Sequence, residues 1–121
     1  MHAQAPSSSI LPPEQQLLTQ LQLLLQDYLT TDDIDDILDS YHFSYKHHLG
    51  QFRKSGEAYI CHPLSVAIIL AEMQMDVHGI MAAILHDVVE DTEVTSAEIQ
   101  TLFGEDVALL VDGVTKLTKL D

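Results

Sequence analysis

The stretch that decides the fold runs Ile80-Met81-Ala82-Ala83-Ile84-Leu85-His86-Asp87-Val88-Val89-Glu90-Asp91-Thr92. Its apolar residues recur at helical spacing as far as Leu85, which predicts an amphipathic helix with one buried face. His86 and Asp87 then occupy neighbouring helical positions, about 100° apart around the helix axis. An imidazole and a carboxylate placed in this way can converge on a single metal ion.

Three carboxylates crowd the end of this predicted helix. Residues three or four apart share a helix face, so Glu90 and Asp91 lie one turn beyond His86 and Asp87. Like charges at this spacing repel, and a divalent cation would offset that repulsion. Taken singly, Asp87 could be a helix-end carboxylate and His86 a core histidine with one hydrogen bond. Taken together, the residues have the layout of a metal-dependent phosphohydrolase site, with two carboxylates placed to handle a water.

Other polar residues with a chemical role are expected shortly before this helix. His62 precedes Pro63 at a helix start and is a further candidate metal ligand, although a surface or capping histidine is the alternative. Mixed nitrogen and oxygen ligands suit Mn, Fe, Co or Zn better than Ca. Arg53 and Lys54 lie in the loop that leads to His62. Their charges suit a base or a phosphate, and the alternative is a solvated basic loop.

Composition limits the class of protein. The chain has 121 residues, 46% of them apolar, which fits one domain with a substantial core. The net charge of -14 and only five basic residues argue against general DNA or RNA binding. Cys61 is the only cysteine and is expected to be a small buried hydrophobe. No signal peptide or membrane span is apparent, so we expect a cytoplasmic protein with no membrane partner.

The pattern along the chain predicts an all-α fold with no strands. Residues 1–10 are expected to be a disordered lead, and residues 11–121 to form the domain. Pro12-Pro13 is predicted to open the first helix, Thr30-Thr31-Asp32-Asp33 to cap the second, Pro63 to lie in the first turn of the third, and Asp76 to cap the fourth. Thr95 and Glu98 predict a capping box for the fifth helix, and residues 106–117 form the last predicted helical stretch. Gly50 and Phe103-Gly104 are predicted helix ends. The helix after Pro63 is expected to bury Val66, Ile69, Leu70 and Met73. His48 is expected in the core or behind the site, with His42 and His47 facing solvent.

Three runs, in order and at matching spacing, closely resemble the hydrolase domain of RelA/SpoT-type alarmone enzymes. They are HLGQFRKSGEAYICHPL at 48–64, AAILHDVVEDT at 82–92, and Phe103-Gly104 through Val111-Asp112-Gly113-Val114-Thr115-Lys116-Leu117. The resemblance covers the chain from about Tyr41 to its end. It implies the HD-superfamily fold, an irregular helical bundle, and removal of pyrophosphate from the 3′ position of (p)ppGpp with Mn²⁺ as the usual metal.

The resemblance also implies roles for individual residues. The implied metal ligands are His62, His86 and Asp87. Glu90 and Asp91 would orient or activate the attacking water. The guanine nucleotide would be held by Arg53 and Lys54, with Arg53 against the guanine. Because the His-Asp and Glu-Asp pattern is intact, the sequence resembles the hydrolytic, SpoT-like branch of the family.

The sequence departs from the family pattern in two places. Ala58 stands where the family usually has proline, which removes no ligand. A later family motif, resembling Leu-Ala-Asp-Arg-Leu-His-Asn and carrying the last metal-ligating aspartate, is not found before Asp121. Asp112 matches a different family segment. The chain is therefore expected to be the N-terminal part of a longer stringent-response alarmone enzyme. Its bundle is expected to be incomplete at the C-terminal end, weak or inactive alone, and prone to self-association through that face. The alternative is a catalytically silent nucleotide-binding or protein-interaction fragment.

Overall fold

The computed structural model describes residues 11–118, which form six helices and no strand. The predicted all-α fold is therefore confirmed for the described part of the chain. The predicted disordered lead at residues 1–10 lies outside it. The helices are α2 (Pro13–Gln26), α3 (Thr31–His48), α4 (Cys61–Glu72), α5 (Val77–Asp91), α6 (Ser96–Phe103) and α7 (Glu105–Thr118).

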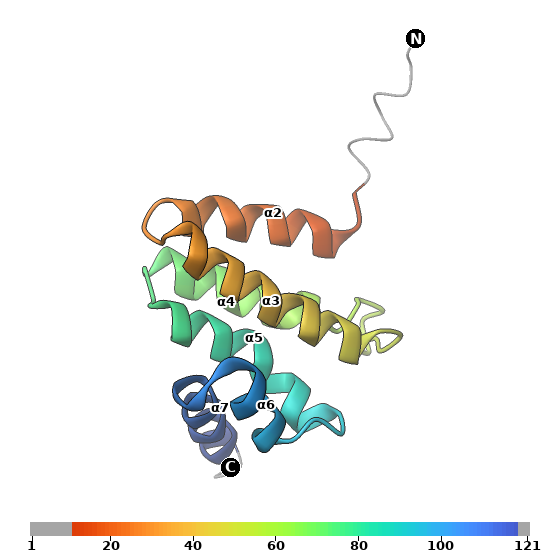
Figure 1. Cartoon of the computed structure of the whole chain (residues 1–121). Helices are drawn as coiled ribbons and strands as arrows, with labels where there is room; N and C mark the ends of the chain where they lie inside the picture. The colour runs from red at the N-terminus through yellow and green to blue at the C-terminus, as the bar shows by residue number, and fades with distance from the viewer. Residues whose placement is uncertain (1–10, 119–121) are drawn as a thin grey trace.

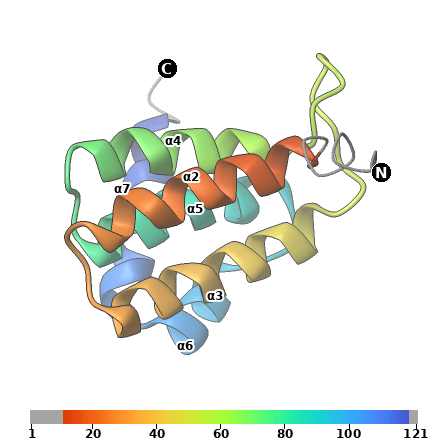
Figure 2. The same cartoon turned by 90° about the horizontal axis from the view of Figure 1, so that it is seen from above.

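Helix α5 lies at the centre of the arrangement and contacts α3, α4 and α7. Figure 1 shows α2, α3 and α4 on one side of α5 and the α6–α7 pair on the other. Figure 2 shows α2 and α4 running side by side, consistent with the contacts between them. The segment that carries the decisive sequence is thus the helix around which the others pack.

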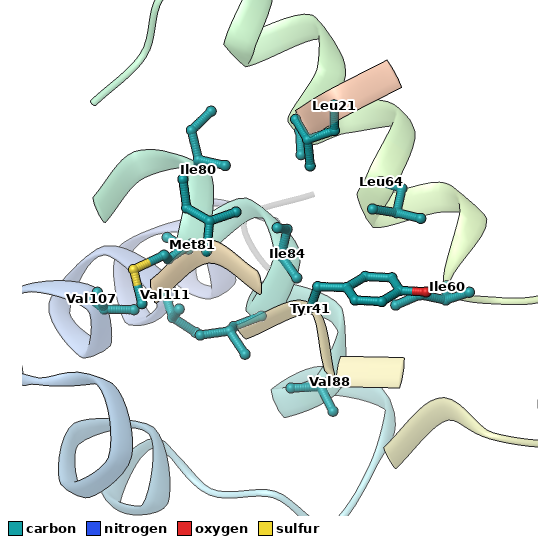
Figure 3. Packing of buried hydrophobic residues seen from close by; sticks show 14 of the residues in the cluster. Leu21, Tyr41, Ile60, Leu64, Ile80, Met81, Ile84, Val88, Val107 and Val111 are labelled. Atoms are coloured by element: carbon teal, nitrogen blue, oxygen red, sulfur yellow. The ribbon is translucent and has the colours of Figure 1, made fainter. Parts of the chain in front are cut away.

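The core is built from the apolar face of α5 and the helices that cover it. Ile80, Ile84 and Val88 are fully buried on α5. Around them lie buried side chains from the other elements (Figure 3): Leu21, Tyr41, Ile60, Leu64, Val107 and Val111. Burial of such side chains contributes on the order of 1.5–3 kcal/mol each, so α5 is fixed in place along most of its length.

The helix starts follow the predicted capping residues. Asp76 caps α5 by accepting a hydrogen bond from the backbone N–H of Gly79 at 2.9 Å. Thr95 and Glu98 form the predicted capping box of α6. Gly104 follows α6 with φ of 99°, a backbone conformation that glycine adopts without strain.

The buried face of α4 differs from the prediction. Ile69 and Met73 were expected to point inward but are 57% and 68% exposed. The core instead receives Leu64, Ala67, Ile68 and Ala71. The helix is apolar on nearly every side, so periodicity alone does not identify the side that α2 and α5 cover. The other two expected core residues, Val66 and Leu70, are partly exposed and line a surface cavity.

Helix α7 presents apolar side chains to solvent. Leu109, Leu110 and Val114 are 62%, 43% and 36% exposed. Exposed apolar surface of this kind promotes association, and self-association through this face stays a prediction. Within residues 11–118 no helix is both long and apolar enough to cross a bilayer. The cytoplasmic location also stays a prediction.

Truncating Ile84 should destabilise the fold strongly. The side chain is fully buried in the middle of the core, so Ile84→Ala leaves a cavity and should lower the free energy of unfolding by about 2–5 kcal/mol. Urea unfolding followed by circular dichroism measures the change. Ile69→Ala is the matched control, because its exposed side chain should change stability by less than about 1 kcal/mol. Equal losses for the two variants would contradict the position of α5 in the core.

Candidate functional site

Two helices bring three of the predicted site residues together. His62 lies in the first turn of α4, and His86 and Asp87 lie in the second half of α5. Nε2 of His62 is 3.7 Å from Oδ2 of Asp87, and Nδ1 of His86 is 3.1 Å from Oδ1. The two imidazoles therefore lie against the two oxygens of one carboxylate. Pairing of α4 with α5 creates this contact between residues 25 apart in the sequence.

The Asp87 residue is only 9% exposed. Burial alone raises its pKa, but the hydrogen bond from His86 and the charges of His86, His62 and His48 outweigh burial and lower the pKa below its usual value. The pKa of His86 is raised, chiefly by its hydrogen bond with Asp87. The pocket therefore favours an ionised Asp87 beside a positively charged neighbour. A bound cation would satisfy the same preference.

Glu90 joins the cluster from one turn further along α5. Its Oε2 lies 2.6 Å from Nε2 of His86, so both ring nitrogens of His86 face carboxylates. Among residues 11–118, no three His, Cys, Asp or Glu side chains stand at the spacing expected around a metal ion. The donor types of His62, His86 and Asp87 nevertheless fit a transition metal that prefers mixed nitrogen and oxygen ligands. Contacts among these three side chains hold the donors together.

A cavity of about 300 Å³ adjoins the three residues. Its walls come from α4, α5 and α7, and most of them are apolar. Besides His62, His86 and Asp87, the lining residues include Val66, Leu70, Met75, Ala83, Leu110 and Val114. The polar cluster thus lies beside a depression in the surface rather than in a closed core, which leaves it accessible to a ligand.

Arg53 and Lys54 lie on a different part of the site. The segment between α3 and α4 forms a short hairpin, the 51–59 hairpin, which projects from the end of the bundle (Figure 2). It is closed by an antiparallel bridge between Phe52 and Ala58 and by backbone hydrogen bonds from Arg53 to Glu57 and from Tyr59 to Gln51. Both basic side chains are exposed and line a second depression of about 440 Å³.

Tyr59 is a site residue that the sequence did not single out. Its hydroxyl donates a hydrogen bond of 2.5 Å to Oδ2 of Asp91, which is 32 residues away. The side chain also lines the depression beside Arg53 and Lys54. Tyr59 therefore connects the hairpin with the end of α5. A loop tyrosine carries no spacing signal for such a partner, so only the tertiary structure identifies it.

The remaining histidines and Cys61 fall largely where they were expected. His48 is buried, and its ring stacks on Tyr59 with centroids 4.8 Å apart. His42 is exposed. His47 is only partly exposed because it packs against Phe43 at 4.4 Å, so its predicted solvent position is only partly correct. Cys61 is buried, as predicted. His48 thus packs behind the site, which is one of its two predicted positions.

Comparison with known proteins adds an independent line of evidence. A family model described as the HD domain matches residues 40–121. The bifunctional (p)ppGpp synthase/hydrolase SpoT of Escherichia coli (strain K12) is 50% identical over 104 residues. The guanosine-3′,5′-bis(diphosphate) 3′-pyrophosphohydrolase of Vibrio cholerae is 49% identical over 104 residues, and a GTP pyrophosphokinase of Myxococcus xanthus is 50% identical over 95.

The matches cover most of this chain but little of each relative. The two 104-residue matches span 86% of the chain and 15% of the relative, and the Myxococcus match spans 78% and 12%. The chain therefore corresponds to about 15% of the length of the curated relatives that it matches. The site residues, from His48 to Asp91, all lie within the part matched by the family model.

Proposed function

The chain belongs to the HD domain family, and from that premise we propose that its site serves in hydrolysis of the 3′-pyrophosphate of (p)ppGpp with the help of a divalent metal. Hydrolases of this family are metal-dependent. The observation that carries the proposal is the convergence of His62 and His86 on the buried carboxylate of Asp87. The names of the SpoT-like relatives supply the substrate.

The proposed metal ligands are His62, His86 and Asp87, and the proposed metal is Mn²⁺. Two imidazoles and a carboxylate suit Mn²⁺ as well as other divalent transition ions. When bound, such an ion polarises a phosphoryl oxygen and lowers the pKa of water. The preference of the site for an ionised Asp87 supports the assignment, because a ligating carboxylate must be deprotonated.

Glu90 and Asp91 are the residues proposed to orient or activate the attacking water. Both lie at the end of α5, one turn beyond His86 and Asp87. A carboxylate there can accept a proton from the water as its oxygen bonds to phosphorus. The 3′ oxygen of the nucleotide then leaves and takes up a proton, and pyrophosphate is released. The two carboxylates differ in their partners: Glu90 faces His86, whereas Asp91 accepts from Tyr59.

The 51–59 hairpin is the proposed nucleotide-binding element. Arg53 and Lys54 are two of only five basic residues in the chain, and both line the depression beside Tyr59. A planar guanidinium stacks on a base, whereas a lysine ammonium attracts phosphate as a point charge. We therefore assign Arg53 to the guanine and Lys54 to the phosphates.

Hydrolysis of ppGpp with and without Mn²⁺ tests the proposed function directly. The full-length protein should release pyrophosphate and GDP from ppGpp in the presence of Mn²⁺, and a chelator should stop the reaction. GDP alone, which lacks the 3′ group, is the control substrate. Binding of ppGpp without release of pyrophosphate would favour the silent nucleotide-binding alternative over the enzyme.

Substitution of Arg53 tests the nucleotide-binding role. In the full-length protein, Arg53→Ala should raise KM for ppGpp by about tenfold, because loss of one stacked or charged contact costs about 1.4 kcal/mol. The affinity for Mn²⁺ should not change, since Arg53 lies on the hairpin and not among the proposed ligands. Steady-state kinetics and calorimetric titration measure the two effects. Unchanged kinetics would make Arg53 an ordinary solvated residue.

A further inference from the structure

Tyr59 is placed at the junction of three elements. Its backbone N–H donates to the carbonyl of Gln51 at 3.1 Å and closes the base of the 51–59 hairpin. Its hydroxyl reaches Asp91 at the end of α5. Its ring lies on that of His48, at the end of α3, with an interplanar angle of 15°. One side chain thus links the hairpin, α3 and α5.

His48 supports this arrangement from inside the protein. Only 3% of the residue is exposed, and Nδ1 lies 3.3 Å from Oε1 of Gln51, the residue paired with Tyr59 at the base of the hairpin. A buried ring stacked on the tyrosine restricts the directions in which the phenol can point. The direction that remains brings the hydroxyl to Asp91.

Asp91 needs a partner of this kind if its carboxylate is to act on a defined water. It is the last residue of α5 and is exposed, and an exposed carboxylate has several rotamers of similar energy. A hydrogen bond to Oδ2 fixes the side chain and leaves Oδ1 with its lone pairs available.

We propose that Tyr59 is a positioning residue that holds the Asp91 carboxylate and ties the 51–59 hairpin to α5. This inference rests on the proposed function, because it assigns Asp91 to the water and the hairpin to the nucleotide. The hydrogen bond orients the carboxylate and links the hairpin to the end of α5, whereas the stack of the ring on His48 supports the hairpin independently. Tyr59 itself takes no part in proton transfer.

The protonation of the phenol agrees with this role. The hydrogen bond to Asp91, followed by burial and the charges of Asp91 and Asp87, raises the pKa of Tyr59 to about 12 although the charge of Arg53 opposes the shift. The hydroxyl therefore stays protonated and remains a donor at neutral pH.

Tyr59→Phe removes the hydroxyl and keeps the ring on His48. In the full-length protein, kcat for ppGpp should fall by about 10-fold to 100-fold, the usual cost of losing a residue that orients a functional group. KM should change by less than about threefold because the stacked ring still supports the hairpin. A variant with unchanged kcat would overturn the proposal, and so would one in which only KM changed.

Tyr28→Phe is the matched control. The Tyr28 hydroxyl donates a 2.6 Å hydrogen bond to the carbonyl of Met75, so this variant also loses one tertiary hydrogen bond. Neither Tyr28 nor Met75 is a proposed metal ligand, and neither is a proposed partner of the attacking water or of the nucleotide. Tyr28→Phe should lower stability without changing kcat, which separates positioning of Asp91 from a general loss of stability.

A double-mutant cycle tests the contact without any assay of activity. Tyr59→Phe, Asp91→Asn and the double variant are compared by urea unfolding. The double variant should raise the unfolding equilibrium constant by less than the product of the two single effects, with a discrepancy of about fivefold or more. Strict multiplicativity would overturn the proposal. A protein that shows this coupling but does not hydrolyse ppGpp would refute the proposed function and leave the tie between hairpin and α5 supported.

Discussion

His86→Ala should weaken Mn²⁺ binding by more than about 100-fold and remove hydrolysis of ppGpp. Substitution of residues that merely orient ligands usually costs about 10–100-fold in affinity, so loss of a direct ligand should exceed that range. His86 also separates Asp87 from Glu90, since its two ring nitrogens face one carboxylate each. Without the imidazole these negative charges face one another, and the protein without metal should lose stability as well. Calorimetric titration with Mn²⁺ measures the first effect and urea unfolding the second.

His42→Ala is the matched control for this experiment. His42 is an exposed histidine on α3, and its ring contacts that of Tyr41. Its loss should leave the affinity for Mn²⁺ and the rate of hydrolysis unchanged. Equal affinity of the parent and His86→Ala would show that the metal, if bound, lies elsewhere, and would remove the main support for the proposed ligand set.

The starts of α5 and α6 and the end of α6 were predictable because local chemistry specifies them. Asp76 and Thr95 accept backbone hydrogen bonds at the starts of α5 and α6, and Gly104 adopts a positive φ where α6 ends. The buried side of α4 was not predictable in the same way. Ile69 and Met73 are as apolar as the residues that the core receives, and only the positions of α2 and α5 decide which side is covered.

The contacts in the candidate site were predictable to different degrees for the same reason. His86, Asp87 and Glu90 are neighbours on one helix, so helical geometry predicted their proximity correctly. The contact of His62 with Asp87 could be proposed from residue types, but it depends on how α4 crosses α5. The contact of Tyr59 with Asp91 had no sequence signal, because it joins an irregular hairpin to a helix end. Local contacts were predictable from spacing, whereas contacts between elements required the tertiary structure.

Glu90→Gln should lower kcat for ppGpp by about 10²-fold to 10⁴-fold, the range expected when a general base is lost. The amide keeps the size of the side chain but cannot accept a proton from water. Affinity for Mn²⁺ should fall far less than in His86→Ala, because Glu90 is not among the proposed ligands. The lost charge also removes one of the interactions that raise the pKa of His86, so that pKa should move down toward its ordinary value. Single-turnover kinetics and histidine titration by NMR measure the two changes.

Glu93→Gln is the control, since Glu93 is an exposed glutamate just beyond the end of α5. It carries the same change of charge three residues away, so a general electrostatic effect should appear in both variants, whereas loss of the base should appear only in Glu90→Gln. A normal kcat in Glu90→Gln would reduce Glu90 to a partner of His86 and leave Asp91, held by Tyr59, as the remaining carboxylate for the water. The Asp91→Asn variant should then account for the whole loss of rate, whereas comparable losses in both variants would mean that the two carboxylates act on the water together.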